Sequence, residues 1–299
     1  MSKTTDILSA VRRVEIKTTR AVNDMMVGAY HSQFKGRGMD FEELREYSPG
    51  DDVRTIDWNV TARMRKPFVK LHREERELNV MLMFDVSASG DFGTGASSKR
   101  EFAAEVAATL AFSALRNGDK VGLLLFTEEV ELFVPPKKGK RHMLRLIREM
   151  LAFEPIHRGT NILSALTFLN HVQHRRTIMF LLSDFLHSTD GSSHATGNLF
   201  QEIGRTRARH DLVCMHLYDE REHTIPPSGL LTLEDAETGE ILELDTTRQQ
   251  TRDRFERGST DRRQQLDAML ARSGVDFLRL KAGDPFAGML QRFFEQRRR

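Results

Sequence analysis

An acid and two hydroxyls that follow directly on an apolar run have the clearest chemical potential in this sequence. Residues 80–84 read Val-Met-Leu-Met-Phe, and Asp85, Ser87 and Ser89 come next at alternate positions. A short apolar run of this kind is typical of a buried strand. Ligand sites in open α/β sheets lie at the carboxyl ends of the strands. We therefore predict that these side chains lie together at one edge of such a sheet.

Two further loops can bring oxygen atoms to the same edge. The apolar run at residues 177–182 ends in Ser183 and Asp184, and Thr160 stands in a turn just before a predicted helix. The predicted metal ligands are Asp85, Ser87, Ser89, Thr160 and Asp184. Mg²⁺ or Mn²⁺ suits this set because hard divalent cations prefer oxygen donors, whereas Zn²⁺ prefers His or Cys. Alternatively, the same side chains only cap a helix or satisfy loop amides.

The elements that must position these residues are strands joined by crossover helices. From about residue 78, apolar runs alternate with amphipathic stretches, which predicts an α/β fold with a doubly wound, mostly parallel sheet. The predicted strands lie near residues 78–85, 120–126, 130–134, 176–183, 211–218 and 275–280, and the predicted helices near 99–116, 140–151, 162–172 and 247–272. Glu128 and Glu129 separate the second and third strands too closely for a crossover helix. The third strand should therefore be an antiparallel edge strand.

The chain is predicted to divide near residue 78. Residues 1–77 should hold an N-terminal helix up to about residue 28 and then a charged segment, whereas residues 78–299 should form the α/β domain. Within this domain, apolar residues flank a turn-prone stretch, which predicts a hairpin near residues 230–246.

The ligand pattern resembles the metal-ion-dependent adhesion site of von Willebrand factor A-like domains. That site combines a DxSxS loop, a later threonine, and an aspartate after the fourth strand, and the resemblance covers roughly residues 78–285. It implies direct contact of the serines and the threonine with the ion, and direct or water-bridged roles for both aspartates. The insert at residues 90–98 departs from the pattern and could cover or narrow the site.

A charged segment at residues 34–63 reads FKGRGMDFEELREYSPGDDVRTIDWNVTAR and contains the only tryptophan, Trp58. It closely resembles the hallmark segment of the bacterial family named domain of unknown function 58, where it precedes a von Willebrand factor A-like domain. The resemblance implies an adaptor or cofactor of a MoxR-type AAA+ ATPase, acting in chaperone-like assembly or metal insertion. The segment is interpreted either as a layer packed against the sheet, with Trp58 as its apolar anchor, or as a direct partner contact.

Composition argues against several other classes of function. With 45 basic and 43 acidic residues, the net charge of +2 gives no argument for nucleic acid. No apolar run reaches the ~20 residues of a transmembrane segment, and the N-terminus lacks the apolar core of a secretory signal. We therefore expect a cytoplasmic protein without a transmembrane segment.

A phosphate-binding loop is also not predicted. Gly90 and Gly95 have the spacing of such a loop, but Ala96 and Ser97 occupy the positions of its Lys and Ser/Thr.

Two classes of function fit the predicted metal site. In a protein-binding module, an acidic side chain of the partner displaces a water from the incompletely neutralised cation. In a metal-dependent hydrolase, the same cation would activate water and a general base would be needed nearby. No His, Lys or spare carboxylate stands in register with the ligand loops, and Glu128 or Asp91 could serve only if the fold brings it in. We therefore favour a non-enzymatic binding module.

Overall fold

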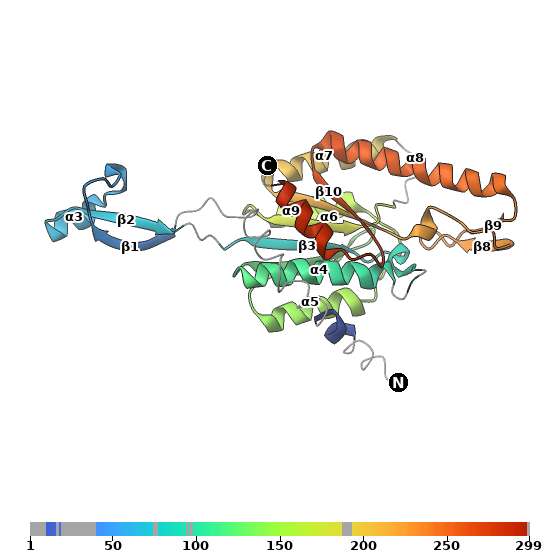
Figure 1. Ribbon diagram of the computed structural model, residues 1–299, viewed down its shortest axis with the longest axis horizontal. Coiled ribbons are helices and arrows are strands. Elements are labelled where there is room, and N and C mark those ends of the chain that lie inside the picture. Colours follow the sequence, from blue (N-terminus) through green and yellow to red (C-terminus); the bar gives the residue numbers. More distant parts are fainter. Residues whose placement is uncertain are drawn as a thin grey trace.

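The centre of the protein is a six-stranded sheet with helices on both faces (Figure 1). The structure, a computed structural model, describes residues 10–15, 18, 40–73, 77–93, 95, 98–186 and 193–297. The strand order is β10-β7-β6-β3-β4-β5, with β5 antiparallel to β4 and the other neighbours parallel. This confirms the predicted α/β fold class, with a mostly parallel sheet and one antiparallel edge strand.

The strands of this sheet lie close to the predicted ranges. They are β3 (Asn79–Asp85), β4 (Lys120–Phe126), β5 (Val130–Lys137), β6 (Ile178–Ser183), β7 (Asp211–Tyr218) and β10 (Asp276–Lys281). β3 is central, with β4 on one side and β6 on the other. Because these strands are parallel, the loops that follow them meet at one edge of the sheet.

Helices from both halves of the domain cover the two faces of the sheet. One face carries α4 (Lys99–Arg116), α5 (Lys140–Ala152) and α9 (Ala287–Arg297); the other carries α6 (Ile162–Val172), α7 (Ser193–Arg209) and α8 (Gln249–Ser273). The helices α7 and α9 were not predicted. Helix α7 presents Leu199 and Ile203 to the core within a largely polar sequence. Helix α9 presents Leu290 and Phe294, with Met289 and Phe293 packed beside them.

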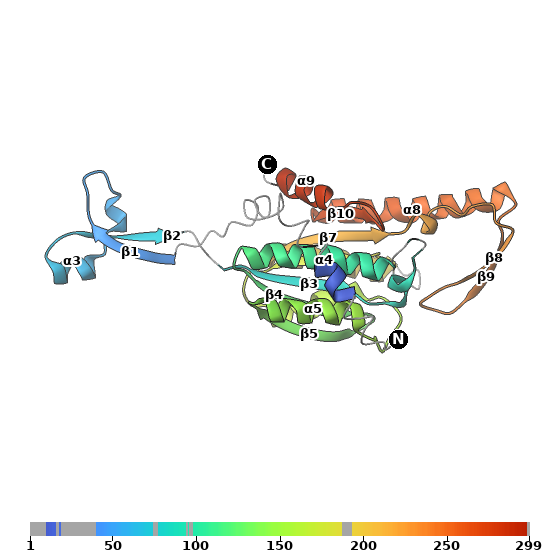
Figure 2. The ribbon, with the colours of Figure 1, turned by 60° about the horizontal axis from the view of Figure 1, so that its bottom comes forward.

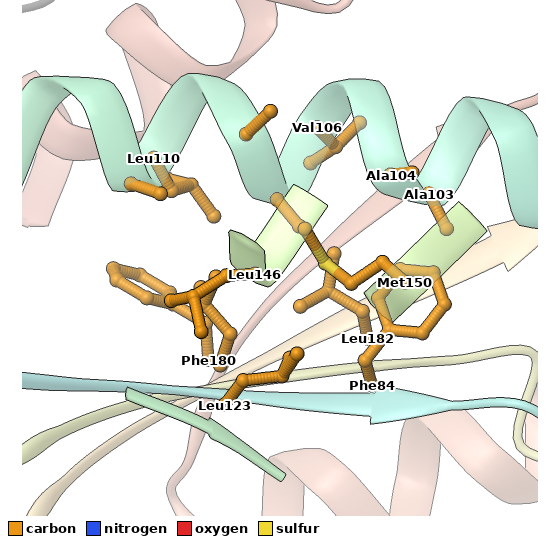
Figure 3. Packing of buried hydrophobic residues seen from close by; sticks show 14 of the residues in the cluster. Phe84, Ala103, Ala104, Val106, Leu110, Leu123, Leu146, Met150, Phe180 and Leu182 are labelled. Atoms are coloured by element: carbon orange, nitrogen blue, oxygen red, sulfur yellow. The ribbon is translucent and has the colours of Figure 1, made fainter. Parts of the chain in front are cut away.

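Alternate side chains of β3 pack on opposite faces of the sheet, as the pleat of a strand requires. Leu82 and Phe84 join the core under α4, whereas Met81 and Met83 join the core under α6 and α7. Figure 3 shows α4 lying over the first of these cores. Burial on both faces explains why β3 reads as a continuous apolar run and not as an alternating one.

A separate two-stranded sheet forms a hairpin, β8 (Leu230–Glu234) and β9 (Ile241–Asp245). It lies beyond the end of the central sheet toward which β7 points (Figure 2). The long helix α8 follows it and returns along the sheet to β10. The division of the chain near residue 78 remains a prediction.

The charged segment forms a small unit of its own. β1 (Asp40–Glu46) pairs antiparallel with β2 (Phe68–Arg73), and α3 (Trp58–Met64) lies between them in the sequence. Figure 1 shows this unit projecting away from the central sheet. Trp58 is 66% exposed, so the interpretation of a layer packed on the sheet with Trp58 as its anchor is wrong.

The predicted N-terminal helix is described only in part. Residues 10–15 and 18 are helical, and Val14 packs into the core on the α4 face. The rest of this predicted helix lies outside the described residues. Within the described residues, no helix combines the length and apolar content needed to cross a membrane.

A buried histidine should make the fold sensitive to acid. His216 on β7 packs against Phe185 and Tyr218, and burial lowers the pKa of His216 to about 4. Between this value and the usual pKa of about 6.5, the unfolded chain binds more protons than the folded one. Titration of His216 should therefore not affect the free energy of unfolding above about pH 6.5. Below that pH it should lower the free energy of unfolding, by on the order of 3 kcal/mol near pH 4.

The measurement is urea unfolding at several pH values for the wild type and for His216→Gln. The variant should lose the part of the pH dependence that lies between pH 4 and 6.5. The same pH dependence in both proteins would contradict the assignment to His216.

Candidate functional site

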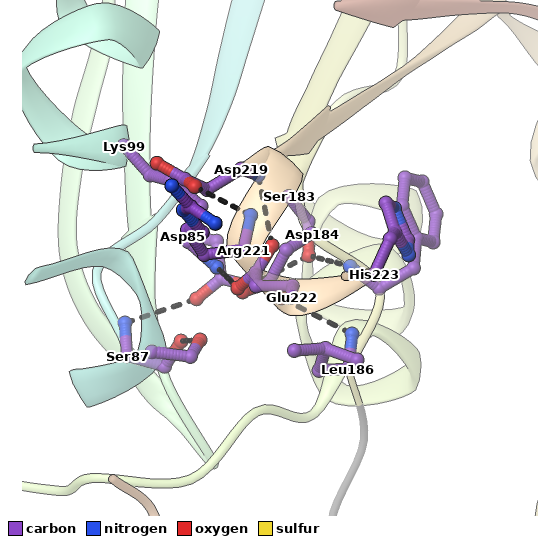
Figure 4. Close-up of polar contacts among 12 residues, drawn as sticks. Asp85, Ser87, Lys99, Ser183, Asp184, Leu186, Asp219, Arg221, Glu222 and His223 are labelled. Carbon is purple, nitrogen blue, oxygen red and sulfur yellow. Dashed lines mark hydrogen bonds and ion pairs between the residues drawn. The ribbon is translucent and has the colours of Figure 1, made fainter. Parts of the chain in front are cut away.

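The ends of β3 and β6 place two carboxylates at the same edge of the sheet (Figure 4). Asp85 is the last residue of β3, and Asp184 follows Ser183 at the end of β6. Oδ1 of Asp85 accepts a hydrogen bond from the backbone N–H of Ser87 (2.9 Å), and Oδ2 accepts one from the Ser183 hydroxyl (2.6 Å). Phe185 has a φ of 56°, which is uncommon for a bulky residue. Backbone strain of this kind concentrates at functional sites.

The two serines of the DxSxS pattern bring their hydroxyls together. Ser87 Oγ and Ser89 Oγ are 3.0 Å apart, and both side chains are buried. These serines, Asp85 and Asp184 line a cavity of about 20 Å³. A volume of this size holds roughly one water-sized particle. The predicted residues other than Thr160 therefore line a single small cavity, whose lining also includes the basic residues Lys99 and Arg100.

Thr160 lies on a loop that is tied to the DxSxS loop. The backbone N–H of Ala88 donates to the carbonyl of Arg158 (3.0 Å). Gly159 allows close packing here, because a Cβ at this position would lie 2.6 Å from Oε1 of Glu128. The N–H of Gly159 donates to the same oxygen (3.1 Å). The peptide group that joins Arg158 to Gly159 is thus held at both its carbonyl and its N–H.

The Thr160 hydroxyl contacts an acidic side chain. It donates a hydrogen bond to Oε1 of Glu237 over 2.8 Å. Glu237 belongs to the turn between β8 and β9 and was not predicted as a site residue. Thr160 itself is not among the residues described as lining the small cavity.

Lys99 and Glu222 complete the charged part of the site, although neither was predicted. Lys99 Nζ lies 2.7 Å from Oδ2 of Asp184 and also contacts Oε1 of Glu222. The Lys99 side chain is 2% exposed. Oε2 of Glu222 accepts from the backbone N–H of Asp219 (2.9 Å). No lysine or spare carboxylate stands in register with the ligand loops in the sequence, and the fold brings Lys99 and Glu222 to them from other segments.

Burial and neighbouring charges set the protonation of these groups. Burial, reinforced by the negative charge of Asp184, raises the pKa of Asp85 to about 7. Burial alone would lower the pKa of Lys99, but the charges of Asp184 and Glu222 raise that pKa above its usual value. Lys99 is therefore protonated at neutral pH. Burial also raises the pKa of Glu222, against the opposing effect of Lys99.

The donor set at the cavity fits a hard divalent cation. The adjacent serine hydroxyls are neutral oxygen donors, and the side chain of Ser87 makes no capping hydrogen bond to the short helix that follows it. Both oxygens of Asp184 accept hydrogen bonds, one from Lys99 and one from the N–H of Leu186 (3.1 Å). Carboxylates held in this way suit water-bridged contact with an ion. No group of three or more His, Cys, Asp and Glu in the described residues has the arrangement of a metal site, so an ion here would depend on the hydroxyls.

Only one of the missed residues carried a local signal in the sequence. Lys99 opens α4, where a positive charge opposes the helix dipole and therefore requires an acidic partner. Glu222 and Glu237 stand in turns, where acidic residues are common.

The two general bases considered from the sequence, Glu128 and Asp91, do not line the cavity. Glu128 accepts a hydrogen bond from the N–H of Gly159, and the Asp91 side chain is 71% exposed.

Curated relatives cover nearly the whole chain. Uncharacterized protein Rv1480 from Mycobacterium tuberculosis is 29% identical over 295 residues, which are 98% of this chain and 90% of that protein. Uncharacterized protein Mb1516 from Mycobacterium bovis matches to the same extent. Uncharacterized protein YeaD from Bacillus subtilis is 29% identical over 120 residues, or 38% of this chain and 28% of that protein.

The solved structures that align with this chain have low sequence identity. An aerotolerance-related membrane protein from Bacteroides fragilis aligns with a TM-score of 0.46 and 15% identity, covering 74% of this chain and 98% of that one. A von Willebrand factor type A structure from Catenulispora acidiphila aligns with a TM-score of 0.40 and 13% identity, covering 77% and 43%.

The model of the family described as "Protein of unknown function DUF58" matches residues 43–265. The match covers most of the chain, from the projecting unit through much of α8. This chain belongs to that family, and the resemblance that the sequence indicated is confirmed.

Proposed function

We propose that this member of the family is a non-enzymatic protein-binding module whose binding depends on Mg²⁺ or Mn²⁺. The observation that carries the proposal is the small cavity lined by Asp85, Ser87, Ser89 and Asp184 at the carboxyl edge of the sheet. Paired hydroxyls at 3.0 Å and two carboxylates offer the hard oxygen atoms that these cations prefer. The ion would supply a coordination position that an acidic side chain of another protein can occupy.

The proposed partner is a MoxR-type AAA+ ATPase, for which this chain would act as an adaptor or cofactor in chaperone-like assembly. The family resemblance at residues 34–63 supports this partner. The metal site supports the manner of binding, through an Asp or Glu of the partner. The cytoplasm, expected from the sequence, would be the compartment of the interaction.

The alternative of a metal-dependent hydrolase is weaker, even though a lysine and an additional carboxylate lie at the site. Lys99 is paired with two carboxylates that raise its pKa, so it does not act as a general base at neutral pH. Both oxygens of Glu222 already accept hydrogen bonds, from Lys99 and from Asp219. Lys99, Asp184 and Glu222 are therefore paired with one another.

A pull-down with the tagged full-length chain and a purified MoxR-type ATPase tests the proposal. We expect capture in Mg²⁺, release in EDTA, and loss of capture with Ser87→Ala, because the variant removes a hydroxyl from the cavity. Ser113→Ala, a buried serine near the far end of α4, is the matched control and should bind normally.

Equal retention of the ATPase in Mg²⁺, in EDTA and with Ser87→Ala would refute metal-dependent binding. The interaction surface would then lie elsewhere. The projecting unit of residues 40–73, with its exposed Trp58, would be the next surface to vary.

A further inference from the structure

The β8–β9 hairpin reaches the proposed metal site with its turn. The two strands pair from Leu230 opposite Asp245 to Glu234 opposite Ile241. Six residues, 235–240, then form the turn, and within it Glu237 accepts the hydrogen bond from Thr160 at 2.8 Å. Thr160 is one of the five residues that the sequence predicts as metal ligands. The turn therefore brings a carboxylate of the chain itself to the edge of the site.

The turn is built to present Glu237 in a fixed position. Oδ1 of Asp235 accepts hydrogen bonds from the backbone N–H groups of Glu237 and Thr238, each at 2.9 Å. Gly239 closes the turn with a φ of 73°, a conformation that glycine adopts without strain. A loop fixed by its own hydrogen bonds loses little entropy when its side chain binds.

The rest of the hairpin is attached mainly at its base. Thr246 is buried there, and its N–H and hydroxyl both donate to the carbonyl of Gly229. In the described part of the chain, β8 and β9 make their extensive contacts with each other and not with another helix or strand. The hydrogen bond between Glu237 and Thr160 joins the end of this arm to the loop before α6, and the strands themselves make few contacts that oppose a displacement of the arm.

We propose that Glu237 is an intrinsic acidic ligand, which completes the coordination of the metal in the free protein and gives way to the acidic side chain of the partner. This inference rests on the proposed metal-dependent function. A carboxylate is the chemical group that a partner would use on such a cation. Glu237 already accepts a hydrogen bond from Thr160, a predicted ligand. In this proposal it competes with the carboxylate of the partner for one coordination position.

Because of this competition, a partner binds only if its total contacts are more favourable than the contact of Glu237 with the metal. A single carboxylate that merely replaces Glu237 gains little, because one metal–carboxylate contact is exchanged for another. A partner must add further contacts beside the metal, and these determine specificity. The hairpin arm, once released, no longer accepts the hydrogen bond from Thr160.

Mn²⁺ binding to the full-length chain tests the assignment of Glu237. Isothermal calorimetry gives the affinity, and the relaxation rate of water protons per bound Mn²⁺ reports the number of metal-bound waters. Glu237→Ala should weaken Mn²⁺ binding by about tenfold, the scale for losing one ligating or supporting group. It should also raise the relaxation rate, since water takes the vacated position. Glu240→Ala, in the same turn, is the matched control and should behave as the wild type.

The outcomes separate this inference from the function on which it rests. If Mn²⁺ binds the wild type, is lost in Ser87→Ala, and binds Glu237→Ala with unchanged or tighter affinity, the intrinsic ligand is refuted while the metal site stands. A weaker affinity without a change in water relaxation would also refute it, because no coordination position has opened. If the wild type binds no Mn²⁺, both proposals fail.

Discussion

Replacing Lys99 by methionine is expected to lower the free energy of unfolding by about 3–5 kcal/mol, the usual effect of removing one member of a buried ion pair. The Lys99 side chain is 2% exposed and contacts the carboxylates of Asp184 and Glu222. Methionine fills a similar volume but carries no charge. The buried carboxylate of Asp184 and the partly buried carboxylate of Glu222 would then lie near Asp85 without a compensating cation. The folded state can relieve this only by taking up protons.

Chemical denaturation in EDTA measures this effect. Lys120→Met is the matched control, because Lys120 pairs with Glu77 at an exposed position where an ion pair contributes little. Mg²⁺ should restore part of the stability of the Lys99 variant if the site binds metal, since a divalent cation would replace the lost charge. A Lys99 variant as stable as the control in EDTA would contradict the buried ion pairs.

Asp85→Ala is expected to abolish Mg²⁺ and Mn²⁺ binding, with a loss of affinity of at least about a hundredfold. Asp85 contributes one of the two cavity carboxylates and holds the DxSxS loop through its bond to the N–H of Ser87. The fold should survive the change. Burial and the charge of Asp184 raise the pKa of Asp85, so its ionised form is unfavourable in the folded protein, and removing it relieves that cost.

Calorimetry should show one bound ion per chain in the wild type and no binding in the variant. Thermal unfolding gives a second measurement, because a ligand at 100 times its Kd stabilises a protein by about 2.7 kcal/mol. Asp91→Ala, at an exposed position on the same loop, should retain both effects. Unchanged binding in Asp85→Ala would refute the assignment of the site.

The pattern of apolar runs was sufficient to predict the central sheet. Strands such as β4 (Lys120–Phe126) are buried on both faces, so nearly every position is apolar and the run has clear ends. The short connection at Glu128 and Glu129 likewise identified the antiparallel edge strand β5. Helix α7 was missed because few apolar residues anchor it to the core, within a segment rich in polar residues. The exposure of Trp58 was also not predictable, since a lone tryptophan in a charged segment usually packs inward.

The sequence was sufficient to predict those residues of the candidate site that come directly after a strand. Asp85, Ser87, Ser89 and Asp184 share one cavity because parallel neighbouring strands end at the same edge, and that rule can be applied to a sequence. The sequence by itself thus determined the sheet and the gathering of these oxygen atoms at its edge.

Only the tertiary structure decided which charged side chains surround these oxygen atoms. Lys99 meets Asp184 across 85 positions of the chain and Glu222 across 123, and Thr160 meets Glu237 across 77. These contacts depend on where α4 begins and where two turns fold back over the sheet edge. Neither periodicity nor local spacing encodes such placements, because the energy that fixes them comes from burial and pairing of charges between segments that are distant in the sequence.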